Sequence, residues 1–312
     1  MRSATRIAAV LILLVCFAWG CSGSRPAEQD IPASLLTLPV LKNHVTRVAV
    51  LLTHTPQTAI GREAGALYLT QLIGSMRKED RRLQLVTAQD PELPAFFVDM
   101  TRPGAQMPDA FTLAAAARSA GYQAWATARI ESLRTHDERT GILWFRRTKH
   151  FVFFDLTLAL YDAFSGAKLS DQVIESSTKI SDEASEAFQA GAWSELEDLQ
   201  ESIIDLSEDL GEKAAKALEN RRWCAAVVKV QEDRVFLASG SRAGIRVGDR
   251  LAVLDGQRTM QDRSGEKFIV PGFEVGRIEI VHVADEMSEA KVLDLQGGSS
   301  RIQSGDMAVP IK

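Results

Sequence analysis

Residues 151–161, FVFFDLTLALY, decide the fold of this chain, because apolar residues alternate there at the period of a β-strand. The apolar side chains on one face are Val152, Phe154, Leu156, Leu158 and Leu160. Asp155 and Thr157 fall on the opposite face. A face this apolar must be covered by other elements, so it predicts the core of a sheet. Ser165-Gly166 then supplies a turn into a return strand, which predicts an antiparallel hairpin.

The chain before this strand alternates strand and helix patterns. Residues 47–52, RVAVLL, form a short apolar run that is typical of a strand covered on both faces. A helix is predicted over residues 59–78, since apolar residues recur there at helical spacing. The residues of this stripe are Leu69, Leu72, Ile73 and Met76. Residues 83–86 are the next predicted strand.

A loop with four prolines leads from that strand to a second helix. Asp109 stands where an N-cap is expected, and the alanine-rich helix 110–120 ends at Gly121, a C-cap signal. Residues 45–181 are therefore predicted to form an α/β domain with a mixed sheet.

Residues 182–221 show one long, acidic, amphipathic helical pattern. Its apolar positions step by three and four: Leu196, Leu199, Ile203, Leu206 and Leu210. The stripe is short and Gly211 interrupts it, which favours docking on the neighbouring sheet over a coiled coil. Residues 182–212 contain eleven acids and no base. A solvated helix face is the favoured interpretation, and a recognition site for a basic partner is the alternative.

Residues 222–312 hold only short strand patterns separated by turn signals, which predicts a small all-β, SH3-like barrel. A pattern recurs in this segment: Ile245-Arg-Val-Gly-Asp249 and Ile302-Gln-Ser-Gly-Asp306 each precede a strand. We expect a turn in which glycine takes positive φ and the aspartate caps backbone N–H groups. The predicted structural turn residues are Gly240, Gly244, Gly248, Asp249, Gly305 and Asp306. The overall class is α+β.

Residues 1–20 have the pattern of a signal peptide. Arg2 and Arg6 precede an apolar stretch of thirteen residues, which is too short to span a bilayer. Without those two arginines the net charge falls from −5 to −7. An acidic chain with no cluster of basic residues argues against nucleic acid as a partner.

Cys21 is the predicted lipid attachment site. It follows Ala18-Trp-Gly20, which resembles the lipobox of bacterial lipoproteins, and Ser22 after it implies sorting to the outer membrane. Ordinary secretory cleavage at the same place is the alternative. Residues 21–44 contain scattered prolines and no sustained period, so we expect a lipid-anchored tether. Cys224 is then the remaining thiol, and we expect a small core residue rather than a reactive one.

No motif for a reaction stands out. The five histidines lack a second ligand at metal-binding spacing, so no metal or other cofactor is expected. Ser75-Met-Arg-Lys78 and Ser165-Gly-Ala-Lys168 match a Ser-x-x-Lys pattern, but neither has the context of a penicillin-interacting enzyme. A non-enzymatic protein is expected.

The run Gly240 to Leu251, GSRAGIRVGDRL, resembles the C-terminal barrel of the flagellar assembly protein T family. The segments at Gly272 to Gly276 and Ile302 to Val309 fit the same pattern. That family has a middle domain similar to the N-terminal domain of the Tol-system propeller protein. Residues 48–52 and 162–169 also resemble the curli-secretion lipoprotein superfamily. The resemblance implies an assembly or scaffold factor of the flagellar basal body.

The chain departs from that family in two ways, since a short tether and a lipid anchor replace an N-terminal domain and an ordinary signal peptide. Two alternatives therefore stay open: a curli-type secretion lipoprotein, and a periplasmic lipoprotein that regulates peptidoglycan synthesis. A curli-type secretion lipoprotein forms a pore and would need a hairpin that crosses the membrane. The best candidate for this hairpin, residues 142–154, carries basic residues in its middle, which would make contact with lipid costly. Expected partners are periplasmic or outer-membrane proteins, flagellar basal-body ring proteins first among them. Self-association into a homo-oligomer is left open.

Overall fold

The computed structural model describes residues 44–141, 144, 146–219, 221–261, 263, 265–296 and 301–311. The expected signal peptide, Cys21 and the tether up to residue 43 lie outside the described residues. Everything described below belongs to one compact unit.

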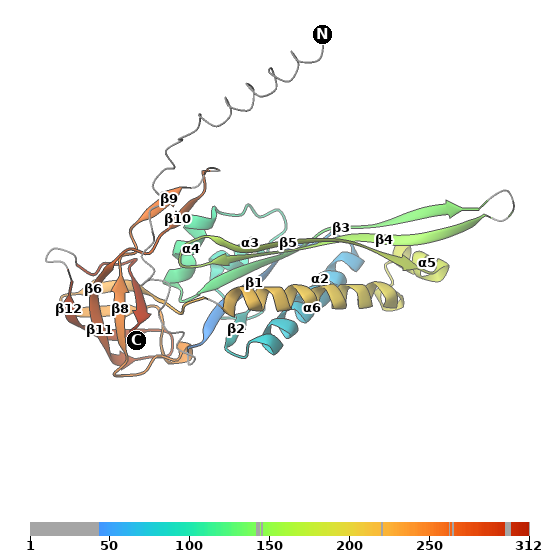
Figure 1. The fold of residues 1–312 in the computed structure, drawn as a ribbon. Helices are drawn as coiled ribbons and strands as arrows, with labels where there is room; N and C mark the ends of the chain where they lie inside the picture. Colours follow the sequence, from blue (N-terminus) through green and yellow to red (C-terminus); the bar gives the residue numbers. More distant parts are fainter. Residues whose placement is uncertain are drawn as a thin grey trace, which may run out of the picture. The chain divides into compact units, whose positions relative to one another are not determined.

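The N-terminal half is built on one five-stranded sheet, in the order β2-β1-β3-β4-β5 (Figure 1). The strands are β1 (Thr46–His54), β2 (Leu83–Val86), β3 (Ala124–Thr140), β4 (Arg147–Asp162) and β5 (Lys168–Ile180). β1 runs parallel to both β2 and β3, whereas β4 is antiparallel to β3 and to β5. The predicted mixed sheet and the hairpin through Gly166, which has φ of 80°, are thus confirmed.

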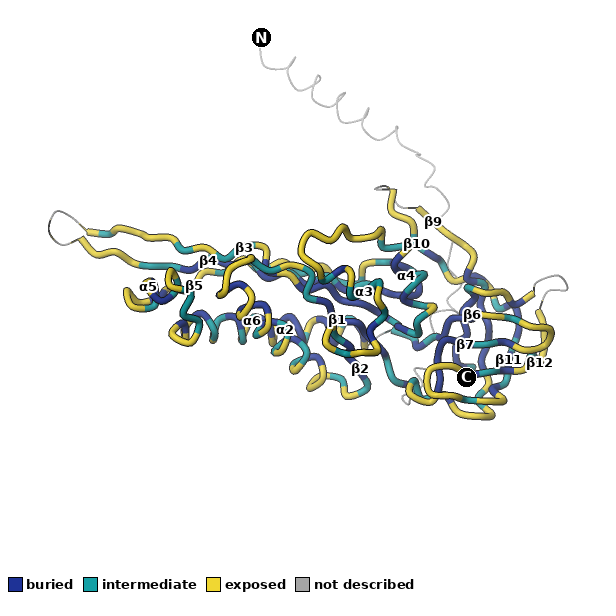
Figure 2. Tube along the Cα trace, turned by 180° about the vertical axis from the view of Figure 1, so that it is seen from behind, coloured by how far each residue is buried: buried dark blue, intermediate teal, exposed yellow. Residues whose placement is uncertain are grey.

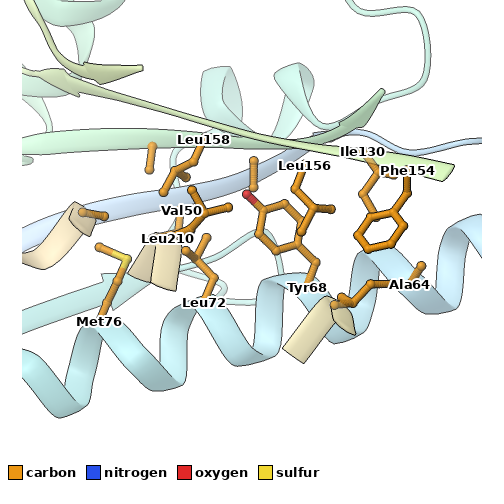
Figure 3. Close-up of a cluster of buried hydrophobic side chains, with 14 of the residues drawn as sticks. Val50, Ala64, Tyr68, Leu72, Met76, Ile130, Phe154, Leu156, Leu158 and Leu210 are labelled. Carbon is orange, nitrogen blue, oxygen red and sulfur yellow. The ribbon is translucent and has the colours of Figure 1, made fainter. Parts of the chain in front are cut away.

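Helices cover both faces of this sheet. One face packs against α2 (Ala59–Glu79) and α6 (Glu197–Glu219), and the other against α3 (Ala95–Met100) and α4 (Ala110–Ser119). The apolar face of β4 is buried as predicted. Figure 3 shows Phe154, Leu156 and Leu158 pointing at α2 and α6.

The buried stripe of α2 differs from the prediction. Leu72 and Met76 are buried, but Leu69 and Ile73 are only half-buried and pack at the side of the core. The stripe that meets the sheet has a spacing of four residues: Ile60, Ala64, Tyr68, Leu72 and Met76. Tyr68 fits among these apolar groups because its hydroxyl donates to the backbone oxygen of Thr157 at 2.9 Å.

The prediction of one continuous helix over residues 182–221 is wrong. The structure has two helices, α5 (Asp182–Ala190) and α6, with the 3₁₀ turn η2 (Trp193–Glu195) between them. The break occurs at Gly191, which has φ of 78° and caps the C-terminus of α5 in the left-handed conformation. The apolar stripe of α6 docks on the sheet, as expected.

Gly211 does not interrupt this stripe but lies at the contact between α6 and α2. A Cβ atom added to Gly211 would lie 2.6 Å from the Cβ of Ser75 and 2.8 Å from the backbone oxygen of Leu72. The missing side chain therefore allows the two helices to approach closely. The hydroxyl of Ser75 donates to the backbone oxygen of Glu208 at 2.7 Å across the same contact.

The segment between β2 and β3 agrees with the prediction in part. The carboxylate of Asp109 caps α4 by accepting from the backbone N–H of Thr112 at 2.9 Å, and Gly121 has φ of 78°. The expected loop before Asp109 contains the short helix α3, for which the sequence pattern gave no signal. Among the described residues, no helix combines the length and the apolar character needed to cross a bilayer.

The C-terminal segment forms the predicted all-β barrel, closed in the order β11-β12-β7-β6-β13-β8. The strands are β6 (Ala225–Gln231), β7 (Arg234–Leu237), β8 (Arg250–Leu254), β11 (Glu274–Val283), β12 (Ser288–Leu295) and β13 (Met307–Pro310). β13 pairs with both β6 and β8 and so closes the ring. A hairpin of β9 (Thr259–Gln261) and β10 (Lys267–Ile269) forms a separate two-stranded sheet. Figure 2 shows the buried interior of the barrel strands in dark blue.

The close approach at Gly211 gives a matched pair of glycine substitutions. We expect Gly211→Ala to lower the free energy of unfolding by about 1–3 kcal/mol, because the added methyl group overpacks the helix contact. Gly74→Ala in α2 should raise it by about 0.5–1 kcal/mol, because alanine favours helix and a Cβ atom added at this exposed site would meet no neighbouring atom. Urea unfolding of both variants measures this. Equal changes in the free energy of unfolding of the two variants would contradict the packing role of Gly211.

Candidate binding groove on the barrel

The first Gly-Asp turn leads into β8. Gly248 has φ of 90°, a conformation that glycine adopts at little cost. The carboxylate of Asp249 accepts from the backbone N–H of Arg246 at 2.8 Å and so closes the turn on itself. Both residues line an open groove on the barrel.

The second Gly-Asp turn leads into β13 and is more deeply embedded. Gly305 has φ of 95°, and the carboxylate of Asp306, which is 2% exposed, accepts from the backbone N–H of Gln303 at 2.7 Å. Its other oxygen accepts from the backbone N–H of Gly256 at 3.1 Å. Asp306 therefore connects its own turn to the loop after β8, beyond what the sequence pattern suggests.

Gly240 and Gly244 lie elsewhere, around the 3₁₀ turn η3 (Ser241–Ala243). Gly244 has φ of 84°, whereas Gly240 has an extended conformation, and a Cβ atom added to it would lie 2.1 Å from the backbone oxygen of Ala284. The backbone oxygen of Ala243 accepts from the N–H of Val45 at 3.2 Å, just before β1. The six predicted turn residues thus occupy three separate places: this loop, the Gly248 turn and the Gly305 turn.

The groove has a volume of about 580 Å³ and a mixed polar lining. It is lined by His44, Gly248, Asp249, Arg250, Leu251, Arg277, Leu293, Asp294 and Ile311. Its two arginines are held by neighbouring carboxylates: Arg250 pairs with Glu279 at 2.9 Å and Arg277 with Glu274 at 2.8 Å. Charges of both signs, with apolar Leu293 exposed beside them, suit a polar partner with donors and acceptors of its own.

His44 is a groove residue that the sequence pattern did not indicate. It is 9% exposed and lies edge-on to Trp223, with ring centroids 4.2 Å apart. Neither ring nitrogen has a hydrogen-bond partner among the described residues. Burial lowers the pKa of His44, and the nearby Asp249 carboxylate opposes that shift in part. His44 precedes β1 without any periodic pattern around it, so no local signal marked it.

A charged cluster joins the barrel to the α/β domain. Arg47 of β1 pairs with Glu286 at 2.5 Å and with Glu92 at 3.2 Å, and Arg242 pairs with the same two carboxylates at 2.8 and 2.7 Å. The guanidinium of Arg47 also lies 4.6 Å from the ring centroid of Tyr122. Burial raises the pKa of the Tyr122 hydroxyl to about 12. The four ion-pairing residues come from both domains, and the cluster is therefore a structural clamp.

The remaining candidate groups have structural partners. The hydroxyl of Ser165 and the guanidinium of Arg221 both contact the carboxylate of buried Asp162, which lies at the end of β4.

Cys224 is partly buried, and burial raises the pKa of its thiol to about 12, which opposes thiolate chemistry. The described residues contain no group of three side chains arranged to hold a metal ion. Cys21 lies outside the described part of the chain.

The fold and groove define an α+β protein in which a helix-covered mixed sheet carries a small closed barrel with a polar groove. The sequence matches no protein-family model and no curated protein. Solved structures that resemble part of it include a minor lipoprotein from Acinetobacter baumannii, with 12% identity, coverage of 55% of this chain and 93% of that one, and a TM-score of 0.29. Another is the lipoprotein GNA1162 from Neisseria meningitidis, with 14% identity, coverage of 47% and 94%, and a TM-score of 0.25.

A third similar structure is TolB from Acinetobacter baumannii, with 10% identity, coverage of 83% of this chain and 62% of that one, and a TM-score of 0.30. Sequence identities and TM-scores this low do not indicate a shared function.

The positive φ of Gly248 generates a prediction about stability. We expect Gly248→Val to lower the free energy of unfolding by about 1–3 kcal/mol, because a β-branched residue is strained at this φ. A Cβ atom added at Gly248 would meet no neighbouring atom within 4 Å, so the backbone conformation is the expected source of the cost. Gly248→Asn should cost less, since asparagine tolerates positive φ better. Urea unfolding of the full chain measures this. If Gly248→Val has the same free energy of unfolding as the wild type, the backbone at residue 248 is not strained by a β-branched residue.

His44 generates a prediction about pH. A histidine with a lowered pKa binds its proton less well in the folded than in the unfolded state, so its stabilisation is present above the ordinary pKa near 6.5 and is lost as the pH falls below it. We expect wild type to lose stability relative to His44→Phe between pH 7 and 5, by at most about 1.4 kcal/mol per pH unit. Phenylalanine keeps a ring against Trp223. Parallel stability curves for the two proteins would show that His44 does not titrate in this way.

Proposed function

We propose that this chain is a non-enzymatic lipoprotein that is anchored in the outer membrane through Cys21 and acts as an assembly or scaffold factor of the flagellar basal body. Its body would lie in the periplasm, where the α/β domain and the barrel present binding surfaces to other proteins. The pattern of residues 1–21 supports the anchor, and the resemblance of the barrel sequence supports the flagellar role.

One observation carries the proposal: the segment with the family resemblance, Gly240 to Leu251, forms the turn that lines the groove and leads into β8, a strand of the closed barrel. Arg242, in the same segment, takes part in the charged clamp to the α/β domain. A barrel held in this way offers its groove to a partner as a fixed surface. Such preorganised surfaces lower the entropy cost of assembly.

A secretion pore is the weaker alternative. The hairpin of β3 and β4 is long, and Figures 1 and 2 show its far part extending beyond the helices with exposed residues. Neighbouring residues of a strand point to opposite faces, so Glu138 and Arg139, both exposed, place charges on both sides of the hairpin. Lipid contact on either side would then be costly.

Deletion of the gene in a flagellated source tests the proposal. We expect fewer or incomplete flagella and slower swimming with normal growth, and the protein should be found in purified basal bodies. Complementation with Cys21→Ala should fail to restore swimming and should release the protein from membranes, because an acidic body has little other affinity for them. Cys224→Ala is the matched control and should stay bound.

Two outcomes would count against the proposal. Normal motility of the deletion strain, together with absence of the protein from basal bodies, would contradict the flagellar role. It would favour a role in secretion or in peptidoglycan synthesis. A Cys21→Ala variant that stays with the outer membrane would mean that protein contacts, rather than acyl chains, hold it there.

A further inference from the structure

β5 is an edge strand with an open side. It pairs with β4 from Lys168 to Ile180, apart from a bulge at Leu169, and among the described residues none of its backbone groups bonds to any other element. At thirteen residues it is long for an edge. The other edge strand of the same sheet, β2, has four.

The central stretch of the open edge lacks most of the features that usually protect such strands. Native edges are blunted by proline, by lysine, by bulges or by a covering helix. β5 has a bulge at Leu169 and a lysine near each end, Lys168 and Lys179. The stretch between them, from Ser170 to Thr178, contains no proline and no lysine and pairs with β4 in regular register, and its charged residues, Asp171 and Glu175, are both acidic. Val173 is 63% exposed in the middle of this stretch. The edge is therefore available for pairing with another strand.

The helix beside this edge is acidic. The hydroxyl of Thr178 in β5 donates to that of Ser202 in α6 at 2.7 Å, which fixes the side of α6 that looks toward β5. Asp198 and Asp205 lie one helical turn to either side of Ser202, and both are exposed. Asp209 continues the same stripe but already pairs with Lys213 at 2.6 Å. Within the described part of the chain, the other two carboxylates form no ion pair, and they accompany the open edge.

We propose that the free edge of β5 binds an extended segment of a partner protein that carries lysine or arginine at alternate positions. The segment would add a sixth strand to the sheet, a known mode of peptide recognition. Its side chains alternate between the two faces, so every second one would lie on the side of α6 and meet Asp198 and Asp205. The intervening side chains would lie on the face of β5 that carries Val173 between Asp171 and Glu175, where an apolar or β-branched residue would pack against Val173.

A second copy of this chain is a poorer occupant. Pairing β5 with β5 of another copy would bring two acidic α6 helices to the same sheet, and like charges would oppose the contact. A basic segment has the complementary charge. The inference deepens the proposed function, on which it rests, by giving one of its partners a chemistry.

The test uses a fluorescein-labelled peptide of eight residues, in which lysine and valine alternate, and the purified mature chain. We expect the peptide to bind in an anisotropy titration at low salt, and the affinity to fall as salt is raised. The same peptide with glutamate in place of lysine should not bind. Hydrogen exchange should slow on binding in residues 168–180, because the added strand protects amides of β5.

Two double variants separate the edge from general charge attraction. Asp198→Asn with Asp205→Asn should weaken binding at least fivefold. Glu197→Gln with Glu208→Gln removes the same charge from exposed positions on the side of α6 near α2, and should change the affinity less than twofold. Thermal unfolding checks that both variants are folded.

Absence of lysine-peptide binding would overturn the proposal, as would equal weakening in the two double variants or binding without protection of β5. A dimer in sedimentation, with β5 protected in the absence of peptide, would also overturn it and make a second copy the occupant. None of these results bears on the anchor or on motility, so failure here is distinguishable from failure of the flagellar role.

Discussion

The α/β domain depends on one requirement, which is that the apolar face of β4 must be kept from water. Each large side chain buried there contributes about 1.5–3 kcal/mol, and the face carries Phe154, Leu156 and Leu158 next to one another in its pleat. No single helix is wide enough to cover the neighbouring strands as well. α2 and α6 cover them together, and they can lie close enough to do so because Gly211 removes a side chain from their contact.

The junction between the domains depends on a different kind of interaction. Arg47 is almost fully buried, and a buried cation is tolerable only where carboxylates surround it. Glu92 comes from the α/β domain and Glu286 from the barrel, so both ion pairs of Arg47 form only when both domains are in place. Gly121 adds a steric condition, since a Cβ atom there would lie 2.5 Å from the backbone oxygen of Ala238 in the barrel. Charge and shape together give the barrel a defined position.

Sequence reasoning succeeded where the cause of a structure is local. The alternation of β4, the Asp109 cap and the fold class follow from periods and turn chemistry within a few residues. It failed where the cause is a contact. In the sequence, Gly211 looks like an interruption of the apolar stripe of a helix. Only the structure shows that it lies against Ser75, a residue far away in the chain, and is therefore a contact residue.

The candidate groove was predictable to a smaller extent. The sequence drew attention to Gly248 and Asp249 as turn residues, but nothing local connects them to His44 or to Arg277. The charged clamp was invisible for the same reason, because Arg47 and Glu286 are separated by most of the chain. The break at Gly191 was hidden by acids and alanines on both sides, which continue the helical pattern across it.

The position of β13 sets an order of events for folding. β13 lies between β6 and β8, so the hydrogen-bonded ring of the barrel is complete only when residues 307–310 are present. The chain is synthesised from its N-terminus, and the sheet of the α/β domain has all its strands by residue 180. Once β6 and β8 have been made, each keeps an unpaired side that can accept a wrong strand until residues 307–310 are added. Until that point the barrel exposes strand edges that a chaperone could protect.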